Sequence, residues 1–255
     1  GDSALVANTT GANNTAVGKS ALGANTTGAG NVAIGYRALD ANTTGTRNNA
    51  IGLDALGSNT TANDNTAIGY NCLNANTTGT RNTAVGSYTL DANTTGNDNI
   101  AVGYEASTNI TTGGSNIAVG RGALDACTTG DLNVAIGHQA LGAQTGQGYN
   151  TAVGGNSMQT NTTGSYNVAV GRQSLYANTT GDNNTAVGYD ALLNNTTASN
   201  NVAVGKGALD ACTTSGSNVC VGNSAGGSIT TGNGENVCVG NNAAGAMTTG
   251  QQNIF

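Results

Sequence analysis

Aromatic and cationic side chains gather at two neighbouring positions of a repeating pattern in this 255-residue chain. Tyrosine and arginine are residue types that often anchor contacts between proteins, and a tyrosine ring can also stack on a sugar. These positions are therefore either a solvated corner that tolerates any soluble residue or a candidate partner-binding stripe for carbohydrate or a protein receptor. Its residues are Tyr36, Arg37, Tyr70, Tyr88, Tyr104, Arg121, Arg172 and Tyr189.

Catalytic chemistry has few candidate residues. His138 is the single histidine, so a Ser-His-Asp or Cys-His arrangement would depend on it alone. The carboxylates are scattered, so the sequence suggests neither an acid–base pair nor a recurring calcium ligand. The five cysteines replace alanine or asparagine of the repeat without zinc-ligand spacing, and we interpret them as small apolar filler. We expect neither an enzyme nor a cofactor or metal site.

The recurring Asn-Thr-Thr triplet supports three hypotheses. It matches the Asn-x-Thr acceptor of N-glycosylation. It also suits a corner whose side chains satisfy the backbone groups of a turn, and repeated threonines could form an ice-binding surface. The candidate glycosylation sites are Asn8, Asn25, Asn42, Asn59, Asn76, Asn93, Asn161, Asn178 and Asn195.

The repeat itself is defined by asparagine. Asn14 and Asn31 begin a series with a step of 17 residues that continues to Asn218, and the next step, to Asn236, is 18 residues. With Asn14 as position 1, every full unit has Ala or Cys at position 3, Val or Ile at position 4, Gly at position 5 and Thr at position 13. Such a regular period is typical of a solenoid.

Two short strands per unit fit this pattern, one at positions 1–4 and one at positions 8–11, with corners rich in Gly and Asn. Apolar runs of three or four residues are too short for helices. We predict an all-β fold, a parallel β-solenoid of about 15 coils of 17 residues. It forms one domain, 1–255, with a partial coil at 1–13, full coils at 14–252 and a partial coil at 253–255. Stacked position-1 asparagines are expected to form an amide ladder.

Composition excludes several classes of protein. Charged residues make up 8% of the chain, against about 25% in ordinary domains. The net charge of −6 gives no basic footprint for nucleic acid. No stretch approaches the ~20 apolar residues that a transmembrane helix needs. We expect no nucleic-acid partner and no membrane span.

Two features predict association between copies. Position 3 never becomes polar, which indicates close approach to a neighbour, either another chain or an inside corner of the same coil. The chain begins at position 5 of a unit and stops at position 3, so a second copy placed head to tail would nearly complete the broken coil. A homo-oligomer, as a side-by-side trimer or a head-to-tail filament, is therefore expected.

The unit Asn14-Thr-Ala-Val-Gly18 and its copies resemble the head repeats of YadA-like trimeric autotransporter adhesins and the repeats of phage and bacterial tail fibres, here as a 17-residue variant. The resemblance covers the whole chain. It implies a left-handed parallel β-roll, usually three chains side by side, located on a cell surface or virion fibre. The expected function is that of an extracellular, non-enzymatic fibre segment, a rigid repeat rod for attachment or filament assembly.

Overall fold

The computed structural model describes residues 1–146, 148–232 and 234–255. Its contacts divide the chain into two compact units, Gly1–Asp131 and Leu132–Phe255, and each is described by itself. The part of the chain described here forms short strands and turns and contains no helix. Accordingly, none of these residues belongs to a helix that could cross a membrane.

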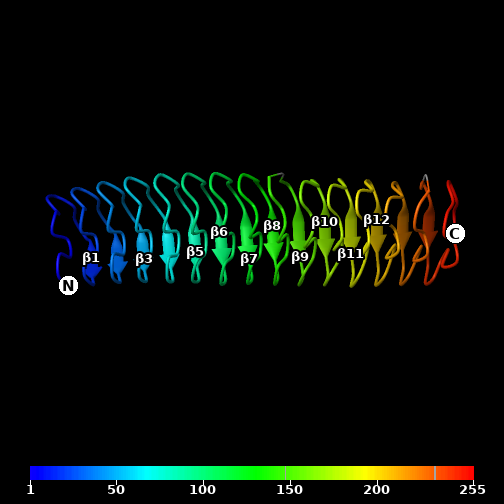
Figure 1. The fold of residues 1–255 in the computed structure, drawn as a ribbon, viewed down its shortest axis with the longest axis horizontal. Coiled ribbons are helices and arrows are strands. Elements are labelled where there is room, and N and C mark those ends of the chain that lie inside the picture. Colours follow the sequence, from blue (N-terminus) through cyan, green and yellow to red (C-terminus); the bar gives the residue numbers. More distant parts are fainter. Residues whose placement is uncertain (147, 233) are drawn as a thin grey trace. The chain divides into compact units, whose positions relative to one another are not determined.

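Each full repeat contributes one three-residue strand at positions 2–4 (Figure 1). The first unit contains β1 (Thr15–Val17), β2 (Val32–Ile34), β3 (Asn49–Ile51), β4 (Thr66–Ile68), β5 (Thr83–Val85), β6 (Ile100–Val102) and β7 (Ile117–Val119). The second contains β8 (Val134–Ile136), β9 (Thr151–Val153), β10 (Val168–Val170), β11 (Thr185–Val187), β12 (Val202–Val204), β13 (Val219–Val221) and β14 (Val237–Val239).

Within each unit, consecutive strands pair in parallel and in register. Thr15 is opposite Val32 and Ala16 is opposite Ala33, so each residue meets its equivalent in the next repeat. This arrangement confirms the predicted parallel β-solenoid with one coil per repeat. Among the described residues there are fourteen strands, one in each full repeat. The predicted count was about fifteen coils, and the partial repeats at the two ends of the chain form turns and isolated bridges instead of further strands.

The predicted second strand at positions 8–11 is wrong. Positions 7 and 9 have positive φ, as in Ser20 (58°) and Leu22 (52°). The backbone N–H of Ala21 donates to the backbone carbonyl of Gly18, and the backbone N–H of Gly23 donates to the backbone carbonyl of Ser20. The segment therefore folds as two consecutive tight turns with a left-handed residue at the third position of each, the type II pattern.

A leucine in this left-handed conformation is unusual, and burial explains it. Leu39 has a φ of 52° and is fully buried. The conformation costs an L-residue about 1–2 kcal/mol, whereas burying a leucine side chain contributes about 1.5–3 kcal/mol. The core contact therefore offsets the backbone strain in each coil that carries leucine at position 9.

The coil interior is narrow and is filled by small side chains. Ala33 at position 3, Ala38 at position 8 and Leu39 at position 9 are fully buried. Because side chains alternate along a strand, positions 2 and 4 point outward, and Ile34 is 39% exposed. Position 3 thus lies against the inside of its own coil, and not at a contact between chains.

Positions 9 and 12 share one interior space. Where position 9 holds a residue smaller than leucine or methionine, position 12 carries a large apolar side chain instead of asparagine, cysteine or glutamine. A Cβ at Gly226 would lie 3.1 Å from Cδ1 of Ile229, so the isoleucine occupies the volume that leucine fills elsewhere. The three exchanged pairs are Ser107–Ile110, Gly226–Ile229 and Ala244–Met247.

Candidate functional site

Three tyrosines of the predicted stripe pack together in the first unit. The ring centroids of Tyr70 and Tyr88 are 5.1 Å apart with an interplanar angle of 83°. Those of Tyr88 and Tyr104 are 6.2 Å apart at 90°. Tyr70 and Tyr104 stand at position 6 of coils two apart, and Tyr88 comes from position 7 of the coil between them. The edge-to-face contacts make one aromatic cluster instead of separate rings.

The other stripe residues form smaller groups. Nε of Arg37 lies 3.2 Å from Asp54 and 3.8 Å from Asp40, and its guanidinium is 6.0 Å from the ring centroid of Tyr36. Arg37 therefore already has partners within the chain.

In the second unit, Arg172 Nη1 donates to the hydroxyl of Tyr189 at 3.2 Å, and its guanidinium is 5.6 Å from that ring centroid. In the first unit, the charge of Arg121 acts on Tyr104 and opposes the rise of its pKa. The predicted stripe is thus several local groups.

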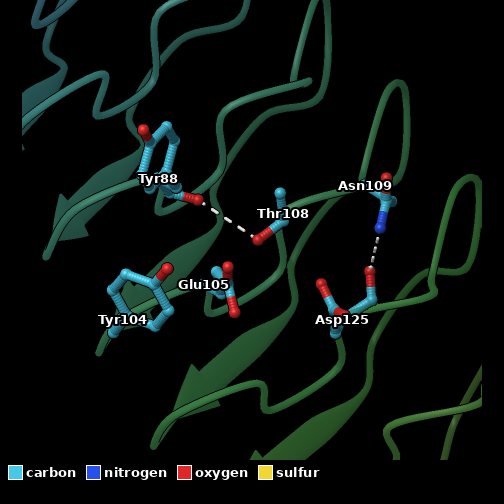
Figure 2. Close-up of a pocket in the computed structure, with 6 residues that line it drawn as sticks. All are labelled: Tyr88, Tyr104, Glu105, Thr108, Asn109 and Asp125. Atoms are coloured by element: carbon cyan, nitrogen blue, oxygen red, sulfur yellow. Dashed lines mark hydrogen bonds between the residues drawn. The ribbon is translucent and has the colours of Figure 1, made fainter.

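A groove of about 450 Å³ opens beside the tyrosine cluster (Figure 2). Its volume is within the range of small-ligand sites. Two predicted stripe residues line it, and sequence reasoning missed the four polar ones. The lining residues are Tyr88, Tyr104, Glu105, Thr108, Asn109 and Asp125.

Internal hydrogen bonds fix the polar wall of the groove. Oγ1 of Thr108 donates to the backbone carbonyl of Tyr88 at 3.2 Å. Nδ2 of Asn109 donates to the backbone carbonyl of Asp125 at 2.9 Å. Both bonds join side chains of one coil to the backbone of a neighbouring coil, and Figure 2 shows them bridging adjacent turns of the ribbon.

The groove is acidic. Burial raises the pKa of Asp125, and the nearby charge of Glu105 raises it further, while a hydrogen bond from Thr108 opposes the rise. A hydrogen bond with the Glu105 carboxylate raises the pKa of Tyr104. Both carboxyl groups therefore face the same space as the two aromatic rings.

The coil that forms the centre of the groove departs from the repeat. Ser107 replaces the usual leucine at position 9, and Ile110 replaces the usual asparagine at position 12. The next coil has Gly122 at position 7, which adds no side chain between Glu105 and Asp125. This coincidence of exceptions is the sequence signal that could have located the groove.

Position 12 forms a ladder of amides inside each unit. Nδ2 of Asn42 donates to Oδ1 of Asn25 at 2.9 Å and to the carbonyl of Gly45 at 3.1 Å. A glycan on such a nitrogen would have to displace these bonds and leave the coil, so this fold does not accommodate modification there. The fully buried candidates are Asn25, Asn42, Asn59, Asn76, Asn93, Asn161, Asn178 and Asn195.

Asn8 is the remaining candidate. It is partly buried, and its Nδ2 donates to the carbonyl of Gly11 at 3.0 Å. Its nitrogen therefore closes the same local turn as the other position-12 asparagines.

The position-1 asparagines also stack as a ladder, in which the predicted amide-to-amide bond occurs at some steps, as from Nδ2 of Asn48 to Oδ1 of Asn31 at 3.3 Å. Oδ1 of Asn14 accepts the backbone N–H of Asn31 at 2.9 Å, and Nδ2 of Asn14 donates to the carbonyl of Gly28 at 2.8 Å. The side chain thus ties one coil to the next and also closes its own coil. Sequence reasoning identified this ladder and missed the one at position 12.

The two threonines of the triplet differ in environment. At position 13, Oγ1 of Thr26 donates to the carbonyl of Thr43 at 3.0 Å, and the side chain is partly buried. At position 14, Thr27 is exposed. The triplet therefore presents one exposed rank of threonines and not two.

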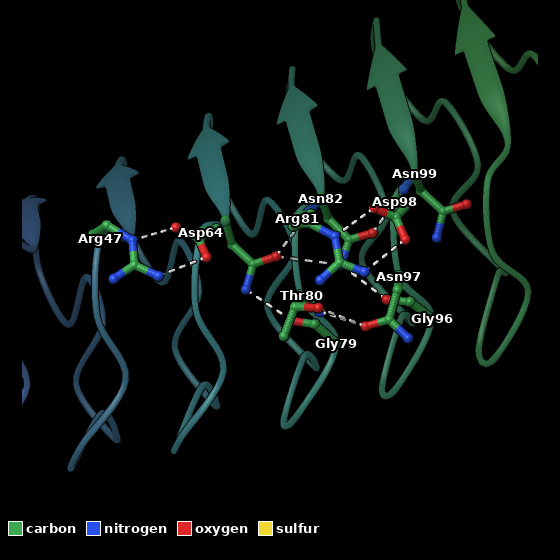
Figure 3. Close-up of polar contacts among 11 residues, drawn as sticks. Arg47, Asp64, Gly79, Thr80, Arg81, Asn82, Gly96, Asn97, Asp98 and Asn99 are labelled. Atoms are coloured by element: carbon green, nitrogen blue, oxygen red, sulfur yellow. Dashed lines mark hydrogen bonds and ion pairs between the residues drawn. The ribbon is translucent and has the colours of Figure 1, made fainter.

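Alternating charges pair along position 17 of the first unit (Figure 3). Arg47 makes a bidentate contact with Asp64, through Nε at 2.6 Å and Nη2 at 2.9 Å. Arg81 contacts Asp98 in the same way, at 2.6 and 2.8 Å. Each pair bridges neighbouring coils at an exposed corner.

All five cysteines are buried free thiols. Burial raises the pKa of Cys72 to about 12 and the pKa of Cys127 and Cys212 to about 11. These values are those of inert filler and not of reactive thiols. Among the described residues, no three His, Cys, Asp or Glu side chains lie close enough together to hold a metal ion.

No family model matches the chain, and no curated protein matches it. The class that its repeat and strand register define is a parallel β-solenoid repeat protein. The resemblance to adhesin and tail-fibre repeats stays a prediction.

Proposed function

We propose that this protein is a non-enzymatic structural fibre segment that acts outside the cell, and that its copies pack side by side through the outward face of the strands. The observation that supports this is the composition of that face. Ile34 and Ile68 at position 4 are each 39% exposed. Positions 2 and 4 of β1–β14 hold Val, Ile, Thr or Asn and no charged residue.

A second copy of the chain is the partner that fits this face best. Because the strands pair in register, the position-4 side chains of successive coils form one apolar file in each unit. Extended exposed apolar patches on soluble proteins mark contact surfaces. An identical chain presents the same uncharged file with the same spacing, as symmetric oligomers require.

Paired variants test the proposal by sedimentation velocity. Ile34→Lys/Ile68→Lys places two cations on the strand face, and Thr44→Lys/Thr78→Lys places the same charge on an exposed corner of the same two coils. We expect the unchanged protein and the corner variant to sediment as oligomers and the face variant as a monomer. An unchanged protein that is monomeric at high concentration would contradict the proposal, and a mass that grows without limit would favour the head-to-tail filament.

A second candidate function is recognition of a receptor or glycan beside the tyrosine cluster. The contacts of Tyr88 with Tyr70 and Tyr104, next to a groove with four polar residues, favour it. This function is compatible with side-by-side packing, because the groove side chains belong to positions 6, 7, 10 and 11 and not to the strand face.

A further inference from the structure

The groove offers hydrogen-bond acceptors. The single hydroxyl proton of Thr108 serves an acceptor of the chain itself, the carbonyl of Tyr88 or the carboxylate of Asp125, and one amide proton of Asn109 is committed to the carbonyl of Asp125. An ionised carboxylate can only accept, which adds the oxygens of Glu105 and Asp125. The two carboxylates therefore favour a ligand that brings donors.

The two carboxylates of the groove lack a close cationic partner, and the nearest charge effect found there is that of Arg121 on Tyr104. Asp54, Asp64 and Asp98 of the same unit each lie beside an arginine. Glu105 and Asp125, by contrast, take part in no ion pair formed by residues that the structure describes. Two neighbouring carboxylates repel each other, and a cation between them would stabilise both.

The rings of Tyr88 and Tyr104 also favour a cationic ligand. A cation is attracted to the face of an aromatic ring within about 6 Å of its centroid. This chain uses that contact elsewhere, between Arg37 and Tyr36 at 6.0 Å and between Arg172 and Tyr189 at 5.6 Å. Hydrogen-bond acceptors, two carboxylates without an ion pair and aromatic rings all complement one type of group.

We propose that the groove binds a primary alkylammonium group, whose three N–H donors and positive charge match this lining. A lysine side chain of a partner protein and a free polyamine both carry this group. The inference does not depend on side-by-side packing, and it gives the ligand chemistry for the second candidate function.

Titration of the 255-residue chain followed by NMR tests the proposal. The probes are putrescine and N-acetyl-lysine methylamide, with 1,4-butanediol and a neutral methyl glycoside as uncharged comparisons. We expect both amines to shift the side-chain signals of Tyr88, Tyr104 and Asn109, and the uncharged molecules to leave them unchanged. Tighter binding of putrescine would identify a polyamine as the ligand, and tighter binding of the lysine derivative would identify a protein partner.

Matched variants separate the groove from general charge attraction. Glu105→Gln/Asp125→Asn removes two negative charges from the groove, and Asp64→Asn/Asp98→Asn removes two from the position-17 corner. We expect the first pair to weaken amine binding at least tenfold and the second to leave it unchanged, with the same far-UV spectrum for both. Equal loss in both variants, or equal binding of the glycoside and the amines, would overturn the proposal. Oligomeric state is measured separately, so the two proposals can fail independently.

Discussion

Oδ1 of Asn93 is buried without a hydrogen-bond partner among the described residues, because Ile110 occupies the equivalent position of the next coil. In the preceding coils, each position-12 Oδ1 accepts from the asparagine that follows it, as Asn76 does from Asn93 at 3.0 Å. Asn195 has the same defect in the second unit, where Cys212 follows. A buried acceptor left unpaired costs about 1–3 kcal/mol, so the end of an amide ladder is a weak point of the coil.

This relationship predicts strong coupling between positions 9 and 12. Ile110→Asn gives Asn93 a partner but leaves a space beside Ser107, so we expect a loss of about 2–4 kcal/mol. Ser107→Leu alone overpacks the coil and should cost about 1–3 kcal/mol. The double variant recreates the usual pair and should recover most of the stability. Urea unfolding of all four proteins measures the coupling, and additive effects would contradict it.

The left-handed residues predict an unusual response to glycine. Gln173 at position 7 has a φ of 56°. Glycine there removes a conformational cost of about 1–2 kcal/mol and adds an entropic cost of about 0.5–1 kcal/mol. We therefore expect Gln173→Gly to raise the free energy of unfolding by about 0.5–1 kcal/mol. Gln173→Val, with a branched Cβ at the same φ, should lower the free energy of unfolding. If thermal melts found the valine variant more stable than the glycine variant, residue 173 would not be strained.

The buried thiols predict protection from alkylation. The pKa of Cys72 is raised to about 12 from its ordinary value of 9.0, so the thiolate is scarce at pH 8 and the sulfur is shielded. Residue-resolved mass spectrometry should find Cys72 unmodified by iodoacetamide until denaturant unfolds the chain. Because the folded pKa is higher than the unfolded one, the contribution to stability is complete below pH 9 and is lost as the pH rises towards 12. Cys72→Ala, which restores the usual position-8 residue, should reduce that alkaline loss.

The position-17 ion pairs predict a site-specific titration. The hydrogen bond from Arg81 lowers the pKa of Asp98 below its ordinary value of 3.8. A lowered carboxyl pKa gives a contribution to stability that is present above pH 3.8 and is lost as the pH falls through the folded pKa. In Arg81→Ala we expect the pKa of Asp98 to return towards 3.8 in a carbon-detected NMR titration. The pKa of Asp64 should change much less in this variant, because its own partner, Arg47, remains.

The sequence predicted the structure well where a single position of the repeat determines a contact between neighbouring coils. The period of asparagine gave the coil, the parallel register and the position-1 ladder, since stacked identical residues must meet. The prediction of a second strand at positions 8–11 was wrong because the backbone conformation determines that segment. A positive φ at a leucine such as Leu22 cannot be recognised from the residue type, and the segment forms two turns. Glu105 and Asp125 were missed for another reason. Their groove is formed by residues of three successive coils, and no single position of the repeat indicates it.

The narrow interior of the coil also affects how the protein responds to temperature. Beside the leucine of most coils, unfolding exposes many alanine methyl groups and asparagine amides, for example those of Ala33 and Asn42. Newly hydrated apolar surface raises the heat capacity, whereas hydrated polar surface lowers it. The heat-capacity change should therefore be smaller than the usual ~12–15 cal/mol/K per residue. A flat stability curve follows, and resistance to cold denaturation with it.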